Sequence, residues 1–194
     1  ISYFDDTNDE LKVAACTNPT CNPATSLATL STVDNTDDVG RYTSITIGAD
    51  GNPIISYFDD TNDALKVAAC TNPTCAAATL STLDNTTDYV GEFASITIGA
   101  DANPIISYWD ASHGALKVAA CTNPTCAAAT ISIVDNIGEV GEYTSIAIGA
   151  DANPIISYFD DTNDALKVAA CTKPTCHTTT PAATPSNVAN TRDG

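Results

Sequence analysis

Short apolar runs separated by turn-forming residues recur along the whole chain. Four such runs follow one another in one stretch: YTSITIGAD at 42–50, IISYF at 54–58, LKVAAC at 65–70 and ATLSTLD at 78–84. Glycine, asparagine, aspartate and proline lie between the runs, as they do between strands. None of the runs has the 3.6-residue periodicity of a helix, and β-branched residues are frequent. The pattern therefore predicts four antiparallel strands and no helix.

The same four-run unit is repeated along the chain. Residues 52–79 return at 103–130 with few changes and begin again at 153, and the chain opens inside the motif with ISYFDDTNDELKVAAC. Repeated four-stranded units of about 50 residues are typical of propeller blades. We therefore predict an all-β, β-propeller-like fold in which a four-stranded antiparallel blade is repeated four times. A β-solenoid or an open repeat array is the alternative.

The repeat also predicts the domain boundaries. One β-repeat domain covers residues 1–177, and residues 178–194 form a Thr/Pro-rich tail whose first residues could still add a fourth strand to the last blade. The expected blades are blade 1 at about 1–34, without its first strand, blade 2 at 42–84, blade 3 at 93–135 and blade 4 at 143–177.

All eight cysteines lie in four hexapeptides, CTNPTC or CTKPTC. An Asn-Pro turn would bring the two cysteines of a hexapeptide to bridging distance, whereas zinc sites use closer pairs that converge with a second pair or with histidines. Disulfides are therefore favoured over reduced thiols or a metal site, and they imply an oxidising compartment, extracellular or at the cell surface. The predicted bonds are Cys16–Cys21, Cys70–Cys75, Cys121–Cys126 and Cys171–Cys176.

The charge balance limits the possible partners. Seven basic residues against 24 acidic ones give a net charge of −17. Such a surface repels nucleic acid and anionic membranes, and no apolar run approaches the ~20 residues needed for membrane insertion. Because the chain contains no methionine, we expect a mature or truncated form.

Meander connectivity predicts two different faces. The turns between first and second strands share one face with the cysteine hexapeptides, and the remaining connections share the other face. The second face would be strongly acidic, either as solvated loops or as a calcium site, although no loop matches an EF-hand and no cofactor is otherwise expected. Its candidate residues are Asp5, Asp6, Asp9, Asp59, Asp60, Asp63, Asp160, Asp161 and Asp164.

The third copy departs from the repeat in a way that could create a ligand site. SYFDDTNDAL becomes SYWDASHGAL, which brings Trp109, Asp110 and His113 into one turn region. An indole beside a carboxylate could stack on a sugar ring and bind its hydroxyls. The alternative, which we favour, is that Trp109 fills a core phenylalanine position in an ordinary hairpin. Asn85 opens an Asn-Thr-Thr sequon, a possible glycosylation site.

The segment IGADANPIISYFDDTNDALKVAAC resembles a repeat of secreted bacterial β-propellers of the sialidase-like and lectin-like kind, and the resemblance covers residues 1 to about 177. Sialidase-type catalysis, which this resemblance would suggest, uses an arginine cluster, whereas this chain has only Arg41 and Arg192. Near-identical carboxylates in every copy also indicate repeat surface, because a single active site usually breaks repeat symmetry. We therefore expect no enzyme.

These observations favour a secreted, non-catalytic structural or adhesive module that belongs to a larger assembly or filament. A lectin-like propeller that binds glycan between blades is the alternative, and a glycan-processing enzyme module is third. The first copy starts at its second strand, so self-association by strand complementation is expected. The missing strand would come from upstream sequence or from residues 178–194 of a neighbouring subunit.

Overall fold

The fold consists of four antiparallel sheets that follow one another along the chain. The computed structural model describes residues 1–21, 28–86, 89–176 and 183–190. Within these ranges the elements of regular secondary structure are all β-strands. The predicted all-β repeat fold is confirmed. The strands are β1 (Ser2–Asp5), β2 (Glu10–Ala15) and β3 (Thr29–Asp34) in blade 1; β4 (Val39–Ile47), β5 (Pro53–Asp59), β6 (Ala64–Cys70) and β7 (Ala78–Asp84) in blade 2; β8 (Val90–Ile98), β9 (Pro104–Asp110), β10 (Ala115–Cys121) and β11 (Ala129–Asp135) in blade 3; and β12 (Val140–Ile148), β13 (Pro154–Asp160), β14 (Ala165–Cys171) and β15 (Ala183–Asn190) in blade 4.

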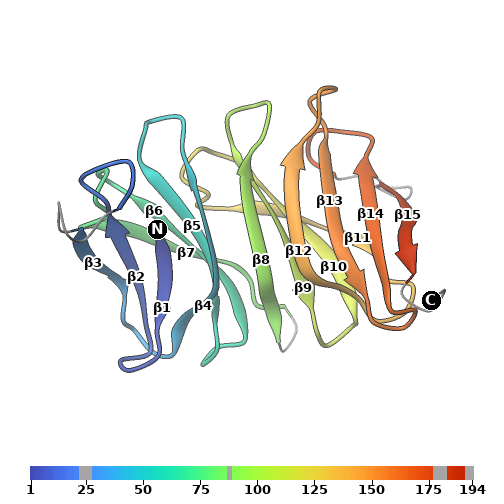
Figure 1. Ribbon diagram of the computed structural model, residues 1–194, viewed down its shortest axis with the longest axis horizontal. Helices are drawn as coiled ribbons and strands as arrows, with labels where there is room; N and C mark the ends of the chain where they lie inside the picture. Colours follow the sequence, from blue (N-terminus) through green and yellow to red (C-terminus); the bar gives the residue numbers. More distant parts are fainter. Residues whose placement is uncertain (22–27, 87–88, 177–182, 191–194) are drawn as a thin grey trace.

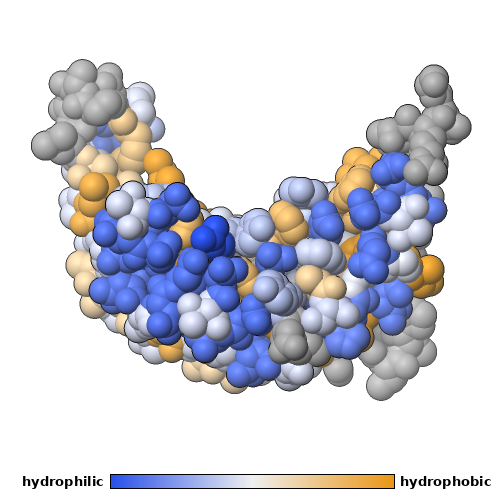
Figure 2. All heavy atoms as spheres, turned by 90° about the horizontal axis from the view of Figure 1, so that it is seen from below, coloured by the Kyte–Doolittle hydropathy of each residue, from blue (hydrophilic) through white to orange (hydrophobic). Residues whose placement is uncertain are grey.

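The four blades form an open crescent rather than a closed ring. They stand side by side in chain order, and the first strands of blades 2, 3 and 4 (β4, β8 and β12) are neighbours (Figure 1). Figure 2 shows a hollow between two arms, with blade 1 in the left arm and blade 4 in the right. The outward faces of these two blades therefore border the hollow.

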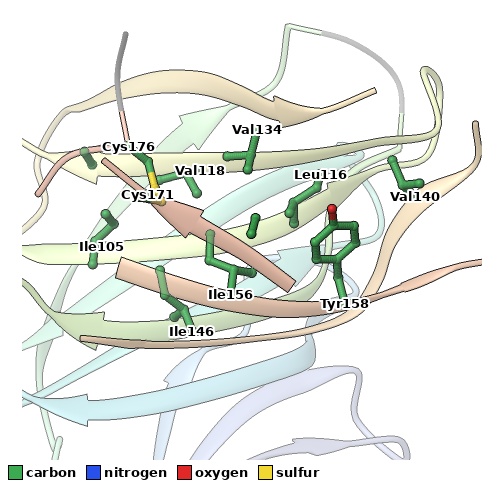
Figure 3. Close-up of a cluster of buried hydrophobic side chains, with 12 residues drawn as sticks. Ile105, Leu116, Val118, Val134, Val140, Ile146, Ile156, Tyr158, Cys171 and Cys176 are labelled. Carbon is green, nitrogen blue, oxygen red and sulfur yellow. A yellow bond between two sulfur atoms is a disulfide. The ribbon is translucent and has the colours of Figure 1, made fainter. Parts of the chain in front are cut away.

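Neighbouring blades pack through alternate residues of their middle strands. Between blades 1 and 2, Leu11 and Val13 of β2 belong to one buried cluster with Ile55, Tyr57 and Ala68 of blade 2. Equivalent residues form the clusters between the later blades, and Figure 3 shows the one between blades 3 and 4. Because side chains alternate between the faces of a strand, β5 and β6 are buried on both faces.

The first strands of blades 2, 3 and 4 each contain a bulge near their start. In blade 2 the register between β4 and β5 shifts twice between Val39 and Ser44, and Tyr42 has a φ of 50°. Gly40, just before it, has a φ of 109°, and a Cβ there would lie 2.7 Å from the Cα of Leu11. The bulge therefore lets the backbone of one blade approach that of the preceding blade closely.

The segment expected to be a tail contributes a strand to blade 4. Residues 183–190 form β15, which pairs with β14 in the register that β7 uses on β6. Ala183 pairs with Cys171 and Ser186 with Val168, as Ala78 pairs with Cys70 and Ser81 with Val67. ATPSNVAN therefore stands in the place of ATLSTLDN, and blade 4 extends to residue 190 rather than ending at 177.

Candidate functional sites

Each contact between neighbouring blades contains a buried lysine held by two carboxylates, which we call the interblade latch. Between blades 1 and 2, Lys66 Nζ lies 2.6 Å from Asp34 Oδ2 and 3.4 Å from Asp59 Oδ2. The Tyr57 hydroxyl donates to Asp34 Oδ2 at 2.7 Å. The other two latches are Lys117 and Tyr108 with Asp84 and Asp110, and Lys167 and Tyr158 with Asp135 and Asp160.

The latch stabilises the charged form of its deepest carboxylates. Burial by itself would raise the pKa of Asp34, but hydrogen bonds from Lys66, Thr36 and Tyr57 outweigh it, and the pKa is lowered. The pKa of Asp84 is lowered for the same reasons. Each latch joins a carboxylate of one blade to a lysine of the next. Separating the two blades would leave a buried charge without its partner, so the latch holds them in place relative to each other.

The latch corrects part of the predicted acidic face. Asp59 and Asp160 are buried and bound to lysine, so the expectation of solvated carboxylates is wrong for them. Their counterpart in blade 1, Asp5, binds Lys12 at 2.7 Å, and this hydrogen bond lowers the pKa of Asp5 to about 2. The signal that sequence reasoning missed was a lysine inside an apolar strand in every copy.

The other predicted acidic residues lie in the turns that follow the second strands. Asp6, Asp9, Asp60 and Asp161 are exposed, and Asp63 and Asp164 are half-buried. The backbone carbonyls of Asp9 and Asp63 accept hydrogen bonds from Val39 and Val90 of the next blade. Within the described ranges no three His, Cys, Asp or Glu side chains form a group that could hold a metal ion, so no ligand cluster supports the calcium alternative there.

The structure places the three predicted ligand residues of blade 3 in different surroundings. Trp109 occupies the position of Phe58 and Phe159 and is half-buried, with its ring centroid 5.9 Å from that of Phe93. Its Nε1 atom is buried and has no hydrogen-bond partner within the described part of the chain. Asp110 belongs to a latch, and His113 Nδ1 lies 3.2 Å from it. Asp110 is therefore held by Lys117 rather than presented to solvent.

The predicted disulfides and the sequon residue are all placed. The four bonds Cys16–Cys21, Cys70–Cys75, Cys121–Cys126 and Cys171–Cys176 are formed, with Cα–Cα distances of 4.9 to 5.2 Å. Asn72 shows why the turn forms, since its Oδ1 accepts hydrogen bonds from Thr74 and Ala76. Asn85 is exposed just after β7, and Thr87 of its sequon lies outside the described residues.

Two equivalent cavities lie between blades on the disulfide-bearing face. One of about 370 Å³ between blades 2 and 3 is lined by Asp50, Asn52, Thr71 and Pro124 among others. The other, of about 280 Å³, lies between blades 3 and 4 in the same place. Asp50 already accepts hydrogen bonds from the backbone and side chain of Asn52. Some of the polar groups that line this cavity are therefore already hydrogen-bonded within their own turn.

An aromatic row crosses the first strands at the opposite face, and sequence reasoning missed it. Tyr42, Phe93 and Tyr143 occupy the equivalent bulges, with ring centroids 4.5 Å and 4.4 Å apart. All three have φ values of 50° to 52°, a left-handed conformation that costs a bulky residue about 1–3 kcal/mol. The signal in the sequence was an aromatic residue two positions after the glycine of VGRY, VGEF and VGEY.

The outward face of blade 4 exposes apolar residues whose counterparts are buried. Ile155 is 43% exposed and Leu166 is 45% exposed, whereas the equivalent Ile54 and Leu65 of blade 2 are 3% and 0% exposed. On the other arm, Ile1 is exposed on blade 1. Figure 2 shows hydrophobic colour on both arms beside the hollow. Blade 4 therefore exposes side chains that the equivalent residues of blade 2 bury against blade 3.

Comparison with known proteins adds no family to this description, since no family model matches the chain and no curated protein matches it. The four disulfides indicate an oxidising environment, as expected for an extracellular protein. Among the residues that the structure describes, no helix is long and apolar enough to cross a membrane.

Proposed function

We propose that the protein is a secreted, non-catalytic structural module that assembles by docking blade 1 of one copy on blade 4 of another. The observation that carries this proposal is the exposed face of blade 4. It repeats the apolar residues that are buried at the three contacts between blades within the chain. A face built in this way is complementary to a further blade of the same kind.

The residues of blade 1 match this role. Leu166 and Val168 hold the positions that Leu11 and Val13 hold at the contact between blades 1 and 2. Blade 1 offers Ile1, Tyr3 and Ala14 where blade 2 offers Ile55, Tyr57 and Ala68 in that contact. Docking of a second copy would therefore reproduce an apolar packing that the chain already uses three times.

One element of the latch is missing at this junction, and it makes the contact weaker than those within the chain. Blade 1 has Tyr3 and Lys12, the counterparts of Tyr57 and Lys66. The register position of Asp84, opposite Leu65, is taken in β15 by Ala189, opposite Leu166. Alanine has no carboxylate to bind Tyr3 and Lys12. We therefore expect a reversible, concentration-dependent assembly.

The assembly would use face-to-face docking rather than donation of residues 183–190. This segment pairs with β14 of its own chain, so donating it would expose the edge of β14. A head-to-tail contact of this kind closes into a ring or extends into a filament, depending on its rotation. The non-catalytic part of the proposal is supported by the latches, which hold the repeated carboxylates of the second strands in ion pairs.

Light scattering coupled to size-exclusion chromatography tests the proposal over a wide range of protein concentrations. The wild-type mass should rise above that of the 20.0 kDa monomer with concentration. Leu166→Lys should keep the protein monomeric because it places a charge in the docked face. Leu80→Lys is the matched control, since Leu80 is exposed on β7, away from both outward faces.

Ala189→Asp provides the opposite change. The new carboxylate would complete the latch with Tyr3 and Lys12 of the second copy and lower the dissociation constant by about tenfold. This gain should disappear when Lys12→Met is added. A 20.0 kDa wild-type monomer at every concentration would contradict the proposal. Glycan binding by such a monomer would favour the lectin-like alternative, which the repeated cavities suggest.

A further inference from the structure

The aromatic row forms a continuous, accessible platform. Tyr42, Phe93 and Tyr143 come from three blades, and their centroid distances of 4.5 Å and 4.4 Å make them contact one another in sequence. Tyr42 is 40% exposed and Tyr143 is 67% exposed. The rings of Tyr42 and Tyr143 are therefore open to a ligand although each stands on a strained backbone, and Phe93 is half-buried between them. Strain retained at three equivalent positions, of which Tyr42 and Tyr143 are exposed and Phe93 is half-buried, is characteristic of binding sites.

Carboxylates flank the row at its blade 3 and blade 4 end. The residue before each ring is Arg41, Glu92 or Glu142. Tyr42 donates a hydrogen bond to Glu92, and burial followed by the nearby charges of Asp60 and Glu142 raises the pKa of Glu92. Burial, followed by the charges of Asp161 and Glu139, raises the pKa of Glu142. These negative charges repel one another, unlike the lysine-bound carboxylates of the latches.

The blade 2 end of the row differs, because Arg41 neutralises it. Its guanidinium lies 3.1 Å from Asp38 and 4.5 Å from the ring centroid of Phe4. This contact shows, within the same protein, a cation resting on an aromatic face beside carboxylates. Blades 3 and 4 place Glu92 and Glu142 where blade 2 has arginine, and the position of Asp38 is Tyr89 in blade 3 and Glu139 in blade 4.

We infer that Phe93 and Tyr143, together with Glu92 and Glu142, form a binding site for a small organic cation that carries a quaternary ammonium group. Ring faces attract such a cation when it lies within about 6 Å of their centroids. The two glutamates supply the opposite charge, and a bound cation relieves their mutual repulsion. An anion would be repelled here, and a neutral ligand would leave the glutamate charges uncompensated.

Trp109 provides a direct readout, since it is the sole tryptophan and its ring lies 5.9 Å from Phe93. The test is a titration of Trp109 fluorescence with choline at constant ionic strength. The neutral probe 3,3-dimethylbutanol has the same shape without the charge and serves as the ligand control. Choline should bind saturably with a dissociation constant on the order of 1 mM, and the neutral probe should not bind.

Variants separate the site from the rest of the fold. Tyr143→Leu removes an exposed ring and Glu142→Gln removes a charge, and each should weaken choline binding about tenfold or more. Tyr89→Leu is the control because Tyr89 is also exposed but stands outside the row. Thermal melting checks that the variants fold. Equal binding of both probes, or wild-type affinity in Tyr143→Leu, would overturn the inference.

The cation site does not depend on assembly. The same titration on the Leu166→Lys variant should give the wild-type dissociation constant, since Leu166 lies on the outward face of blade 4. Loss of choline binding in that variant would show that the site requires a second copy, which would contradict a site built from one chain.

Discussion

A single hydroxyl distinguishes the contact between blades 3 and 4 from the contact between blades 2 and 3. Thr144 of β12 donates a hydrogen bond from its hydroxyl to Ser107 of the preceding blade at 2.8 Å. The equivalent pair between blades 2 and 3 is Ser56 with residue 94, which is alanine. Ser56 Oγ is accordingly buried without a hydrogen-bond partner in the described part of the chain. The missing hydroxyl at residue 94 thus leaves the contact between blades 2 and 3 without the hydrogen bond that is formed between blades 3 and 4.

Ala94→Thr should repair this contact. The new hydroxyl would bond to Ser56 and raise the free energy of unfolding by about 0.5–1.5 kcal/mol. Ala94→Val is the matched control, because valine has nearly the same shape but cannot form the bond. Urea unfolding of the three proteins measures the difference. Equal stability of the threonine and valine variants would show that the hydroxyl does not reach Ser56.

At the level of the strand, the bulges depend on glycine. Gly91 has a φ of 115°, and a Cβ there would lie 2.6 Å from the Cα of Leu65, which cannot move without shifting blade 2. Gly51 also has a positive φ, of 82°, but a Cβ there would meet nothing within 4 Å. Substitution of Gly51 would therefore introduce backbone strain alone, whereas substitution of Gly91 would introduce both strain and a steric clash with blade 2.

Gly91→Ala should lower the free energy of unfolding by about 3 kcal/mol or more, since it adds a clash to the strain of a positive φ. Gly51→Ala should cost only about 1 kcal/mol, for the strain alone. Chemical denaturation compares them with the wild type. Similar losses in both variants would mean that blades 2 and 3 are not held as closely as the bulge geometry indicates.

The sequence repeat made the strands and disulfide turns predictable. Features that depart from the repeat, or that depend on backbone conformation, were harder to predict. Each four-strand unit and each disulfide turn followed from near-identical copies. The strand β15 was expected only as a possible addition by the first residues of the tail, because Pro185 and Ala189 interrupt the motif, and its backbone pairs with β14. The aromatic bulges were missed because residue type gives no warning that Tyr42 adopts a positive φ.

On the scale of the whole molecule, the charged groups fall into two opposed classes. Latch carboxylates such as Asp34 and Asp84 are paired with lysine, and their pKa values are lowered. Glu92 and Glu142 beside the aromatic row have raised pKa values because burial and neighbouring acids disfavour their charge. The sequence shows the net charge of −17 but not this division, which depends on which acids the fold places near a lysine.

This division predicts that stability is greatest at mildly acidic pH. Ionised Glu92 and Glu142 destabilise the fold at neutral pH, and this penalty disappears as the pH falls from their raised pKa values to the ordinary value of 4.5. The lowered pKa values of Asp34 and Asp84 stabilise the fold above the ordinary value of 3.8, and this contribution is lost below it. The free energy of unfolding should therefore peak between pH 3.8 and 4.5.

Urea unfolding from pH 2 to pH 8 measures this profile. The double variant Glu92→Gln and Glu142→Gln removes the two destabilising charges, so its free energy of unfolding should change less between pH 4.5 and neutral pH. Its loss of stability below pH 3.8 should be the same as in the wild type. Lys66→Met is the converse variant, because it removes the cation that binds Asp34. The loss of stability on acidification should therefore begin at a higher pH than in the wild type. A wild-type stability that rises steadily up to neutral pH would contradict the assignment of the two classes, because the glutamates would then carry no penalty in the folded state.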